Sequence, residues 1–474
     1  MKSEKMKSYP SRREFLKETA LTSIGLFILP RHTLGGKGYT APSDKVNIGI
    51  IGNGGQSLFS INELFKLEDV QITAIADPAE YWKNDVLYSV ETGRGPIKKH
   101  IVDFYSKKRP DFKVSEYEDF REMLDREKSL DAVVCASPDN THAYISVMSM
   151  RAGKHVYCEK PLTHNIWEAR KVRDVALETG LATQMGNQGH SRDGIRQTVE
   201  YLRAGAIGRI KEAHSWVPAT RWLPQLNGYP EGETSYPKGF NWDLWLGPTV
   251  WRPFNQLYVP VKWRDFWAFG CGALGDFGCH DMDAATWAFG LHSPESVEVL
   301  PAGNRGSKDI APYGEIGYYR FNRDDRQPEM TMTWYSGGLL PARHDLLPRD
   351  LQVDRRGALF VGEKGIILTN GGTKSPPLIF PKSLRDSFKP PEQSIPRIDT
   401  KHHREWVDAI KGGPKALSNF EYASRLVEIV LLGVLSLRLG GKKIYWDSKN
   451  MKAIGLPEAD EIIREPVRKG WEIV

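Results

Sequence analysis

Cysteine is scarce in this sequence of 474 residues, which contains four: Cys135, Cys158, Cys271 and Cys279. Their spacing matches neither a zinc-binding pattern nor the disulfide framework of a small secreted protein. Cys135 and Cys158 stand in apolar, strand-like segments, where a thiol behaves as a small core residue. A disulfide between Cys271 and Cys279, formed outside the cytoplasm, stays open as an alternative.

The sequence also has no internal repeat, no low-complexity segment and no apolar run of the roughly 20 residues that span a bilayer. Charge of one sign is not in large excess either. The formal net charge is +6, and the stretch through Arg31 holds seven Lys/Arg against three Glu, so the rest of the chain carries about +2. This balance predicts no nucleic-acid partner and no binding to an anionic membrane surface, and we expect no membrane span.

The N-terminal segment departs from this even composition. The motif SRREFLK occupies Ser11–Lys17, and a weak apolar stretch follows at residues 20–29. Paired arginines before a short apolar stretch are typical of a twin-arginine export signal, which suits proteins that fold around a cofactor before export. We therefore predict a signal and linker over residues 1–38, cleaved near Pro30–Gly38, and a periplasmic or otherwise extracytoplasmic location. The alternative is a solvated basic N-terminus with a chance arginine pair.

Strand-like and helix-like segments alternate over residues 44–186. Such alternation predicts a Rossmann-type, doubly wound parallel sheet with helices on both faces, and so an α/β fold. The predicted strands are Val46–Ile51, Val70–Ala76, Asp131–Ala136 and His155–Cys158, and the predicted helices are Gln56–Lys66, Tyr117–Asp125 and Asn140–Ala152. The basic segment Gly93–Pro110 is predicted to be an insertion.

Beyond Gly208, strand-like segments follow one another. They are Ile210–Val217, Ile316–Phe321, Met330–Tyr335 and Ala358–Val361. We expect a C-terminal substrate-binding and dimerisation α/β domain over residues 187–460, with an open, mostly antiparallel sheet. Two terminal helices, His402–Lys411 and Phe420–Leu439, are long enough to pack on either domain. The proline-rich segment 376–396 is expected to be a surface loop or a subunit-contact arm.

A glycine-rich turn follows the first predicted strand and opens the first predicted helix. It consists of Gly52, Asn53, Gly54, Gly55, Gln56 and Ser57. The first glycine permits a tight turn, and the second lets backbone N–H groups approach a pyrophosphate at the helix N-terminus. Ser57 stands where a third glycine or an alanine is usual. We predict that these six residues bind a dinucleotide.

Asp77 ends the second predicted strand, 25 residues after Gly52. A carboxylate at this place can accept hydrogen bonds from a ribose 2′-hydroxyl and repels a 2′-phosphate. Pro78 follows it and no arginine is adjacent, so we predict NAD as the cofactor, with NADP less favoured. The alternative is a glycine-rich turn with a surface aspartate and no ligand.

Three motifs together carry a specific resemblance. The glycine turn with Asp77, the stretch Ser137–His142 (SPDNTH) and the tetrapeptide Cys158–Pro161 (CEKP) resemble the Gfo/Idh/MocA family, which groups glucose–fructose oxidoreductase, inositol dehydrogenase and many sugar dehydrogenases. The similarity extends over nearly all of the chain after the predicted signal. It implies a Rossmann domain, a C-terminal α/β domain whose open sheet often forms subunit interfaces, and hence a homo-oligomer, either a dimer or a tetramer.

The predicted catalytic residues are Lys160, Asp276 and His280. The resemblance implies that Lys160 lies between nicotinamide and substrate, where burial would lower its pKa and permit proton exchange, or its ammonium would bind the reacting hydroxyl. Asp276 and His280 share a helix face at a spacing of four, and a carboxylate that fixes an imidazole tautomer makes a good general base. This spacing also matches the family's second catalytic pair. The alternatives are a surface lysine, an aspartate cap and a packed core histidine.

Further contacts are expected from strand ends and from the loop after the last parallel strand. The cofactor contacts that the resemblance and the motifs suggest are Ser137, Pro138, Asn140, His142, Glu159, Lys160, Asn187 and Gln188. The predicted substrate contacts are His190, Trp263, Arg264 and Asp283. No metal is predicted, and a site made of Asp276, His280 and either His190 or His214 is the alternative.

Aromatic residues gather in one segment, because seven of the fourteen tryptophans lie between Trp216 and Trp267. Aromatic faces suit the C–H faces of sugar rings, so we predict a lid over the substrate. Arg264, beside Trp263, could bind hydroxyls or a carboxylate. A hydrophobic plug and a dimer contact are the alternatives.

The sequence thus predicts an NAD-dependent oxidoreductase that transfers a hydride between a hydroxyl-bearing carbon of a sugar, polyol or glycoside and a tightly held nicotinamide cofactor. We expect no pool of reduced nicotinamide outside the cytoplasm, so an exported enzyme needs a redox-neutral cycle. The first alternative is an NAD-dependent glycoside hydrolase that acts by oxidation, elimination, hydration and reduction. The second is a non-catalytic carbohydrate-binding protein on the same scaffold.

Overall fold

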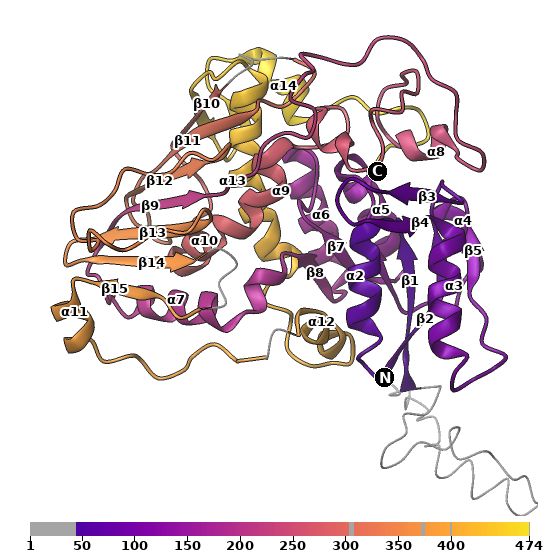
Figure 1. The fold of residues 1–474 in the computed structure, drawn as a ribbon, viewed down its shortest axis with the longest axis horizontal. Coiled ribbons are helices and arrows are strands. Elements are labelled where there is room, and N and C mark those ends of the chain that lie inside the picture. The colour runs from indigo at the N-terminus through magenta and orange to yellow at the C-terminus, as the bar shows by residue number, and fades with distance from the viewer. Residues whose placement is uncertain (1–43, 303–307, 371–374, 399–400, 474) are drawn as a thin grey trace, which may run out of the picture. The chain divides into compact units, whose positions relative to one another are not determined.

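The described part of the chain comprises residues 44–302, 308–370, 375–398 and 401–473 of a computed structural model (Figure 1). The predicted signal and linker lie outside the described residues. Among the helices of the described ranges, none is both long and apolar enough to cross a membrane.

The first sheet has six parallel strands in the spatial order β5-β2-β1-β6-β7-β8. Their bounds are β1 Val46–Ile51, β2 Val70–Ala76, β5 Ser115–Tyr117, β6 Ala132–Cys135, β7 His155–Glu159 and β8 Thr183–Gly186. The strands β1 and β6 are almost entirely buried, as helices on both faces require of a parallel sheet. The predicted Rossmann-type sheet is confirmed.

Helices cover both faces of this sheet. They are α2 Gly55–Leu64, α3 Arg94–Tyr105, α4 Phe120–Arg126, α5 Asp139–Arg151 and α6 Ile166–Thr179. Residues of α2 and α3 share one hydrophobic cluster with the sheet, and residues of α4, α5 and α6 share another. The carboxyl ends of the strands therefore open at one edge of the sheet, where ligands bind in folds of this kind.

The expected insertion at Gly93–Pro110 is wrong, because α3 occupies most of it. Ile97 and Ile101, four residues apart, turn one face of α3 into the core, while Lys98 and Lys99 form ion pairs at the surface. The added element is a short antiparallel hairpin just before it, formed by β3 (Trp82–Asn84) and β4 (Val90–Thr92).

The second sheet has nine strands in the order β15-β14-β13-β9-β12-β11-β10-β16-β17. Their bounds are β9 Ile210–Trp216, β10 Ser296–Ala302, β11 Gly314–Phe321, β12 Met330–Tyr335, β13 Gly357–Gly362, β14 Ile366–Asn370, β15 Leu378–Phe380, β16 Ile444–Asp447 and β17 Lys452–Ala453. Only β9 and β12 pair in parallel among these described strands, so the predicted, mostly antiparallel sheet is confirmed. The segment 376–396, expected to be a loop or arm, supplies the edge strand β15 and helix α11 (Lys382–Ser387).

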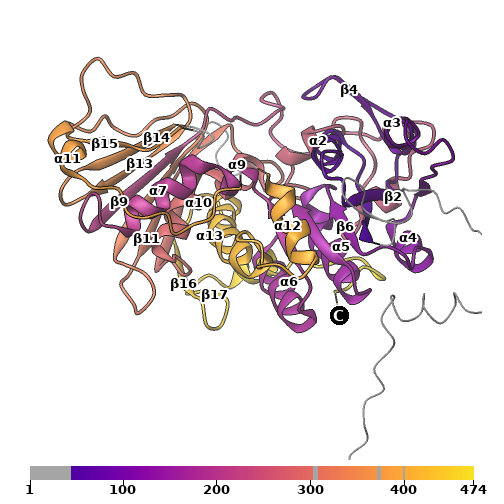
Figure 2. The ribbon, with the colours of Figure 1, turned by 90° about the horizontal axis from the view of Figure 1, so that it is seen from below.

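Four helices lie between the second sheet and the Rossmann half (Figures 1 and 2). They are α7 Asp193–Arg203, α9 Gly272–Asp281, α10 Asp283–Phe289 and α13 Phe420–Arg438. The long helix α13 contacts α6 on one side and α9 and β10 on the other, and its apolar residues join one hydrophobic cluster that runs through both halves. This shared core fixes α9 against the strand ends of the Rossmann sheet.

Two segments near the end of the chain return to the Rossmann half. Helix α12 (His402–Ile410) lies against α2 (Figure 2). Its Trp406 joins the hydrophobic cluster that holds residues of α2 and α3, and its Arg404 pairs with Asp69 at 2.7 Å. Further on, the Tyr144 hydroxyl donates to the Gly470 carbonyl at 3.2 Å.

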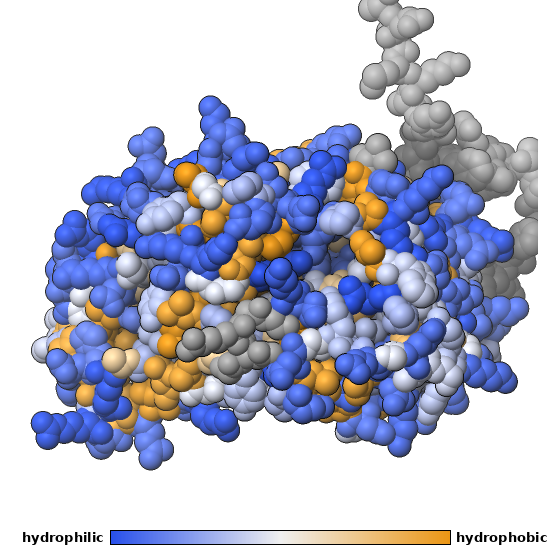
Figure 3. Space-filling view, turned by 90° about the horizontal axis from the view of Figure 1, so that it is seen from above, coloured by the Kyte–Doolittle hydropathy of each residue, from blue (hydrophilic) through white to orange (hydrophobic). Residues whose placement is uncertain are grey.

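The remaining short helices are η3 Gln188–Ser191, α8 Trp242–Leu246, η4 Lys262–Asp265, η5 Pro457–Ala459 and α14 Asp460–Ile463. On the face drawn in Figure 3, hydrophobic residues form several groups separated by hydrophilic ones.

Candidate active site

The glycine turn joins β1 to α2 at the carboxyl edge of the parallel sheet. Gly52 has a φ of +85°, and a Cβ there would lie 2.6 Å from the Ser137 backbone nitrogen, so this position needs glycine. A Cβ on Gly54 would meet no described atom within 4 Å, which leaves open space above the second glycine. No described side chain caps the first turn of α2, so its backbone N–H groups face that space.

Asp77 and Asn53 lie beside this turn. The Asp77 carboxylate accepts hydrogen bonds from the backbone N–H groups of Asn53 at 2.6 Å and Ala79 at 2.7 Å, but burial outweighs these bonds and raises its pKa. The Arg94 guanidinium donates to the Asp77 carbonyl at 2.5 Å, so the fold brings an arginine to this aspartate that the local sequence does not indicate. The Asn53 side chain is fully buried, and neither of its polar atoms has a partner among the described residues.

A first cavity, of about 170 Å³, runs along this edge of the sheet. From the Rossmann half it is lined by Gly52, Asn53, Gly54, Gly55, Gln56, Asp77, Ser137, Pro138, His142, Glu159 and Lys160. Aromatic residues also line it: Trp82 and Tyr88 from the hairpin of the Rossmann half, and Phe240, Trp245, Trp263 and Trp471 from later segments. Trp245 and Trp263 of the predicted lid line this cavity, whereas Trp242 and Tyr258 are buried in a hydrophobic cluster, as the alternative of a plug expects. That the segment covers a substrate stays a prediction.

These residues fit a dinucleotide. The space above Gly54 and the uncapped N–H groups of α2 suit a pyrophosphate, and Asp77 at the end of β2 suits a ribose hydroxyl. The unpartnered Asn53 amide offers a further donor and acceptor inside the cavity. Ser57 does not line the cavity; its hydroxyl donates to the Gly54 carbonyl at 2.7 Å and holds the turn.

Lys160 and Asp276 meet where β7 ends against α9. The Lys160 ammonium donates to Asp276 Oδ1, and Arg264 Nε donates to the same oxygen at 3.5 Å. Burial alone would lower the pKa of Lys160, but the Asp276 carboxylate outweighs it and the pKa is raised. The two cations hold the pKa of Asp276 well below its usual range in spite of burial. Lys160 is thus a charged hydrogen-bond donor, and the predicted fall in its pKa is not what the structure shows.

His280 lies one helical turn beyond Asp276 on α9. The predicted Asp276–His280 pair is not formed in the described structure, because Asp276 Oδ1 bonds Lys160 and Arg264. Burial and the nearby charges of Lys160 and Arg356 lower the pKa of His280 well below its usual value. A neutral imidazole at this place can accept a proton.

His280 lines a second cavity, of about 210 Å³. It is lined by Gln188, Gly189, Arg192, His280, Asp281, Ala284, Arg356, Gly357, Ala358, Thr369 and Asn370. Gln188 Nε2 also donates to Glu159 Oε1 at 3.1 Å, and Glu159 lines the first cavity. Lys160 and His280 therefore line two cavities that nearly meet, one with a dinucleotide-binding turn and one with a polar lining.

Besides Ser57, four predicted contact residues lie in neither cavity lining. Asn140 Nδ2 donates to the Leu246 carbonyl at 3.1 Å and to Thr249 Oγ1 at 2.9 Å. Asn187, His190 and Asp283 form a buried network in which Asp283 Oδ2 lies 3.2 Å from Asn187 Nδ2 and 2.9 Å from His190 Nδ1. Asn187, His190 and Asp283 lie at the junction of the two halves. Because they are buried away from water, they bond one another.

The alternative metal site is not assembled either. His190 bonds Asp283, and His214 on β9 lies 3.1 Å from Glu212. The cysteines at 271 and 279 are both free and buried, so the alternative disulfide is not formed.

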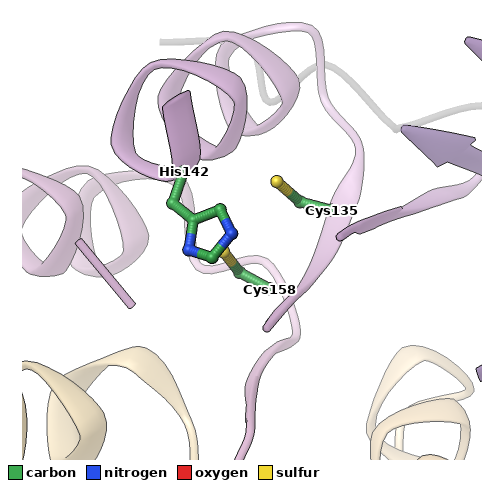
Figure 4. Close-up of side chains that lie close together, drawn as sticks. All are labelled: Cys135, His142 and Cys158. Atoms are coloured by element: carbon green, nitrogen blue, oxygen red, sulfur yellow. The ribbon is translucent and has the colours of Figure 1, made fainter. Parts of the chain in front are cut away.

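A different buried cluster joins Cys135, His142 and Cys158 beside the first cavity (Figure 4). Their potential ligand atoms lie within 4.8 Å of one another. His142, however, turns both ring nitrogens to backbone carbonyls, Nδ1 to Pro161 at 2.7 Å and Nε2 to Ser137 at 2.8 Å. Burial lowers its pKa to about 4 although both carbonyls favour the charged ring. A neutral ring carries one N–H, so His142 donates to one of these carbonyls, and its lone pair is directed at the other carbonyl and not at the thiols.

Glu159 gives the site a pH-dependent stability. Its side chain is buried, and burial raises its pKa to about 7 although Lys160 and Gln56 oppose the rise. Because the pKa is higher in the folded state, the free energy of unfolding should fall as pH rises from about 4.5 to 7. Replacing Glu159 with Gln should remove this fall. The free energy of unfolding of the variant, relative to that of wild type, should therefore rise by about 3 kcal/mol from the lower to the upper end of that range.

Urea unfolding at both ends of the range measures this difference. Replacing Glu178, an exposed carboxylate of α6, with Gln is the control and should leave the pH profile unchanged. If the free energy of unfolding changed with pH in the same way in wild type and in the Glu159 variant, the prediction would be contradicted, because this carboxyl would then titrate normally in the folded protein.

Two family models match the chain. One, described as "Oxidoreductase family, NAD-binding Rossmann fold", matches residues 46–187, and the other, "Oxidoreductase family, C-terminal alpha/beta domain", matches residues 218–322. Both are Gfo/Idh/MocA models, and together they cover half of the chain. The chain belongs to the Gfo/Idh/MocA family. The resemblance inferred from the glycine turn and the CEKP motif is confirmed.

Two curated relatives show what kinds of protein this Gfo/Idh/MocA chain resembles. An alpha-N-acetylgalactosaminidase from Shewanella oneidensis is 25% identical over 236 residues, which are 46% of this chain and 48% of the relative. A levoglucosan dehydrogenase from Pseudarthrobacter phenanthrenivorans is 26% identical over 175 residues, 37% of each chain. The chain spans about half the length, or less, of these relatives.

Solved structures share the fold of this Gfo/Idh/MocA protein over most of its length. The WlbA dehydrogenase from Bordetella pertussis, in complex with NADH and UDP-GlcNAcA, aligns with a TM-score of 0.56 at 16% identity, over 85% of this chain and 99% of that one. Levoglucosan dehydrogenase, in complex with NADH and levoglucosan, aligns with a TM-score of 0.52 at 15% identity, over 85% and 100%.

Several residues of the site could not be found from the sequence. Tyr88 at the tip of the hairpin packs on Gly55, where a Cβ would lie 2.1 Å from its ring, and its hydroxyl donates to Gln56 at 3.2 Å. Trp471 and Arg356 reach the cavities from segments far from any motif. Only tertiary packing brings these side chains to the site, and no local pattern marks them.

Proposed function

We propose that this protein is an NAD-dependent oxidoreductase that oxidises a hydroxyl-bearing carbon of a sugar, polyol or glycoside. One observation carries the proposal: Lys160, bonded to Asp276, lines a cavity with a dinucleotide-binding turn, and the neutral His280, one helical turn beyond Asp276, lines a polar cavity. Proteins that share its fold support it, since they include dehydrogenases solved with NADH and a sugar-derived ligand.

Each residue of the site has its own role in this reaction. The glycine turn and Asp77 would hold NAD, which would supply a hydride acceptor for the carbon that carries the reacting hydroxyl. The Lys160 ammonium donates a hydrogen bond to that hydroxyl oxygen and stabilises negative charge on it, while Asp276 and Arg264 fix the ammonium in place. His280 accepts the hydroxyl proton, because its lowered pKa keeps the imidazole neutral. The alcohol thus loses a hydride and a proton and becomes a carbonyl.

Within this proposal we favour NAD over NADP, a retained cofactor and an exported protein. The Asp77 carboxylate repels a 2′-phosphate, although Arg94 beside it weakens that preference. The aromatic residues over the first cavity would slow release of a dinucleotide. Export through a twin-arginine signal in residues 1–38 and assembly through the open sheet into a dimer or tetramer remain part of the proposal.

A second candidate is redox-neutral glycoside cleavage on the same site. The relative named alpha-N-acetylgalactosaminidase favours it. In that cycle, oxidation next to the glycosidic bond acidifies a C–H group, elimination breaks the bond, water adds, and the hydride returns to the sugar carbon. The same lysine and histidine serve both reactions.

One experiment separates the candidates. The purified protein is loaded with NAD, freed of excess cofactor and mixed with a panel of hexoses, polyols and nitrophenyl glycosides. An increase in the absorbance of reduced nicotinamide supports the oxidoreductase, and release of nitrophenol without net reduction supports the glycosidase. A protein that binds no dinucleotide and transforms no member of the panel contradicts both.

A further inference from the structure

The order of the parallel strands gives the first cavity two distinct ends. Its lining includes Asp77 after β2, the glycine turn after β1 and Lys160 after β7, in a sheet ordered β5-β2-β1-β6-β7-β8. The proposed function assigns the nicotinamide to Lys160 and a ribose to Asp77. The adenine base of the same dinucleotide therefore belongs at the far end of the cavity from Lys160, near the ends of β5 and β2.

Apolar side chains line this end of the cavity. Phe120 begins α4 shortly after β5, and it lines the cavity together with Ile145 of α5 and Trp471. All three residues are largely buried. An apolar wall with aromatic rings suits the flat faces of a purine, which stacks on such rings.

Trp471 reaches this wall from a segment far away in the sequence, and its neighbours fix its position. Its ring centroid lies 4.8 Å from that of Tyr144 and 6.5 Å from that of Phe120, and the guanidinium carbon of Arg121 lies 4.6 Å from it. The backbone of the segment is held as well, because Arg468 Nε donates to the Gly247 carbonyl at 2.9 Å and the Trp471 N–H donates to the Arg468 carbonyl at 3.0 Å. The indole ring is thus positioned before any ligand binds.

We infer that Trp471 is a cofactor-binding residue and that the adenine base of the dinucleotide binds against its indole ring. The inference rests on the proposed function, because it takes NAD as the ligand of the first cavity. Stacking on an aromatic ring adds affinity through the base alone, whatever the nicotinamide half contacts. Trp471 thereby contributes to retention of the cofactor from the end opposite to Lys160.

Photolabelling tests the inference on the unaltered protein. The probe is 2-azido-NAD, which carries its photoreactive group on the adenine, and mass spectrometry of the digested protein locates the attached label. We expect the label on the peptide that contains Trp471, and less of it when ADP-ribose competes. Label confined to other peptides would overturn the inference.

Variants measure the contribution of the ring to affinity. Calorimetry follows the binding of ADP-ribose, which has the adenine and the pyrophosphate but no nicotinamide. Trp471→Leu should weaken this binding about 10- to 100-fold, because leucine has no ring face. Trp471→Phe keeps a ring and should bind within about threefold of wild type. Trp251→Leu is the matched control, since Trp251 is 57% exposed and does not line the first cavity.

The outcomes separate the two claims. A wild-type protein that binds neither NAD nor ADP-ribose contradicts the proposed function. Leucine and phenylalanine variants that lose ADP-ribose binding equally, or that both keep it, would overturn the inference and leave the proposed function standing. Thermal unfolding verifies that each variant is folded, and if the leucine variant does not fold, the photolabelling of wild type decides.

Discussion

Replacing Lys160 with Met should lower turnover about 1,000-fold and leave NAD binding nearly unchanged. Among the described residues, only the Lys160 side chain joins the end of β7 to Asp276 by an ion pair. Its ammonium stabilises negative charge on the reacting oxygen. Methionine has a similar length and no charge, and Arg264 remains to neutralise Asp276. Single-turnover reduction of bound NAD measures the chemical step, and dinucleotide titration measures binding.

Lys238→Met is the matched control for this prediction. Lys238 is exposed in the aromatic segment, so its replacement should leave turnover unchanged. If the Lys160 variant reduced NAD at the wild-type rate, the ammonium would have no part in the reaction. If it lost NAD binding as well, the lysine would be part of the cofactor site only.

Replacing Gly52 with Ala should weaken NAD binding at least about 100-fold, a loss of roughly 3 kcal/mol, and should also destabilise the fold. The new Cβ would lie 2.6 Å from the Ser137 nitrogen and 2.7 Å from the Ala136 carbonyl carbon, at a φ of +85°. These are backbone atoms of the β6 end, so the turn must move. Dinucleotide titration and thermal unfolding measure the two effects.

Gly54→Ala provides the contrast. A Cβ there meets no described atom within 4 Å, so we expect thermal unfolding close to that of wild type. The same Cβ would enter the space assigned to the pyrophosphate and should still weaken NAD binding. If the Gly54 variant bound NAD as tightly as wild type does, the dinucleotide would have to bind elsewhere.

The Rossmann half was predictable because its signals are local. The buried strand β6 is a continuous apolar run and β1 is interrupted only by Asn47 and Gly49, and the glycine turn and Asp77 stand at strand ends, where the fold brings them to one edge. The α3 helix was missed because its basic residues obscure the apolar pair Ile97 and Ile101. The prediction followed the basic composition of the segment and overlooked the helical spacing of the two isoleucines.

The partners of the catalytic groups were less predictable. The spacing of Asp276 and His280 correctly places both on α9, but the bond that Asp276 makes is to Lys160, 116 positions away in the chain. His190 and Asp283 were expected at the substrate, yet they bond each other in the buried junction. A sequence gives residue types and helix faces, whereas a choice between competing partners depends on how the two halves pack.

The position of the nicotinamide ring in a crystal structure grown with NAD tests the central claim most directly. The account predicts a pyrophosphate over Gly54 at the start of α2 and a nicotinamide ring against Lys160, with its reactive face toward the cavity lined by His280. A ring that points away from Lys160, or a dinucleotide bound outside the first cavity, would contradict it.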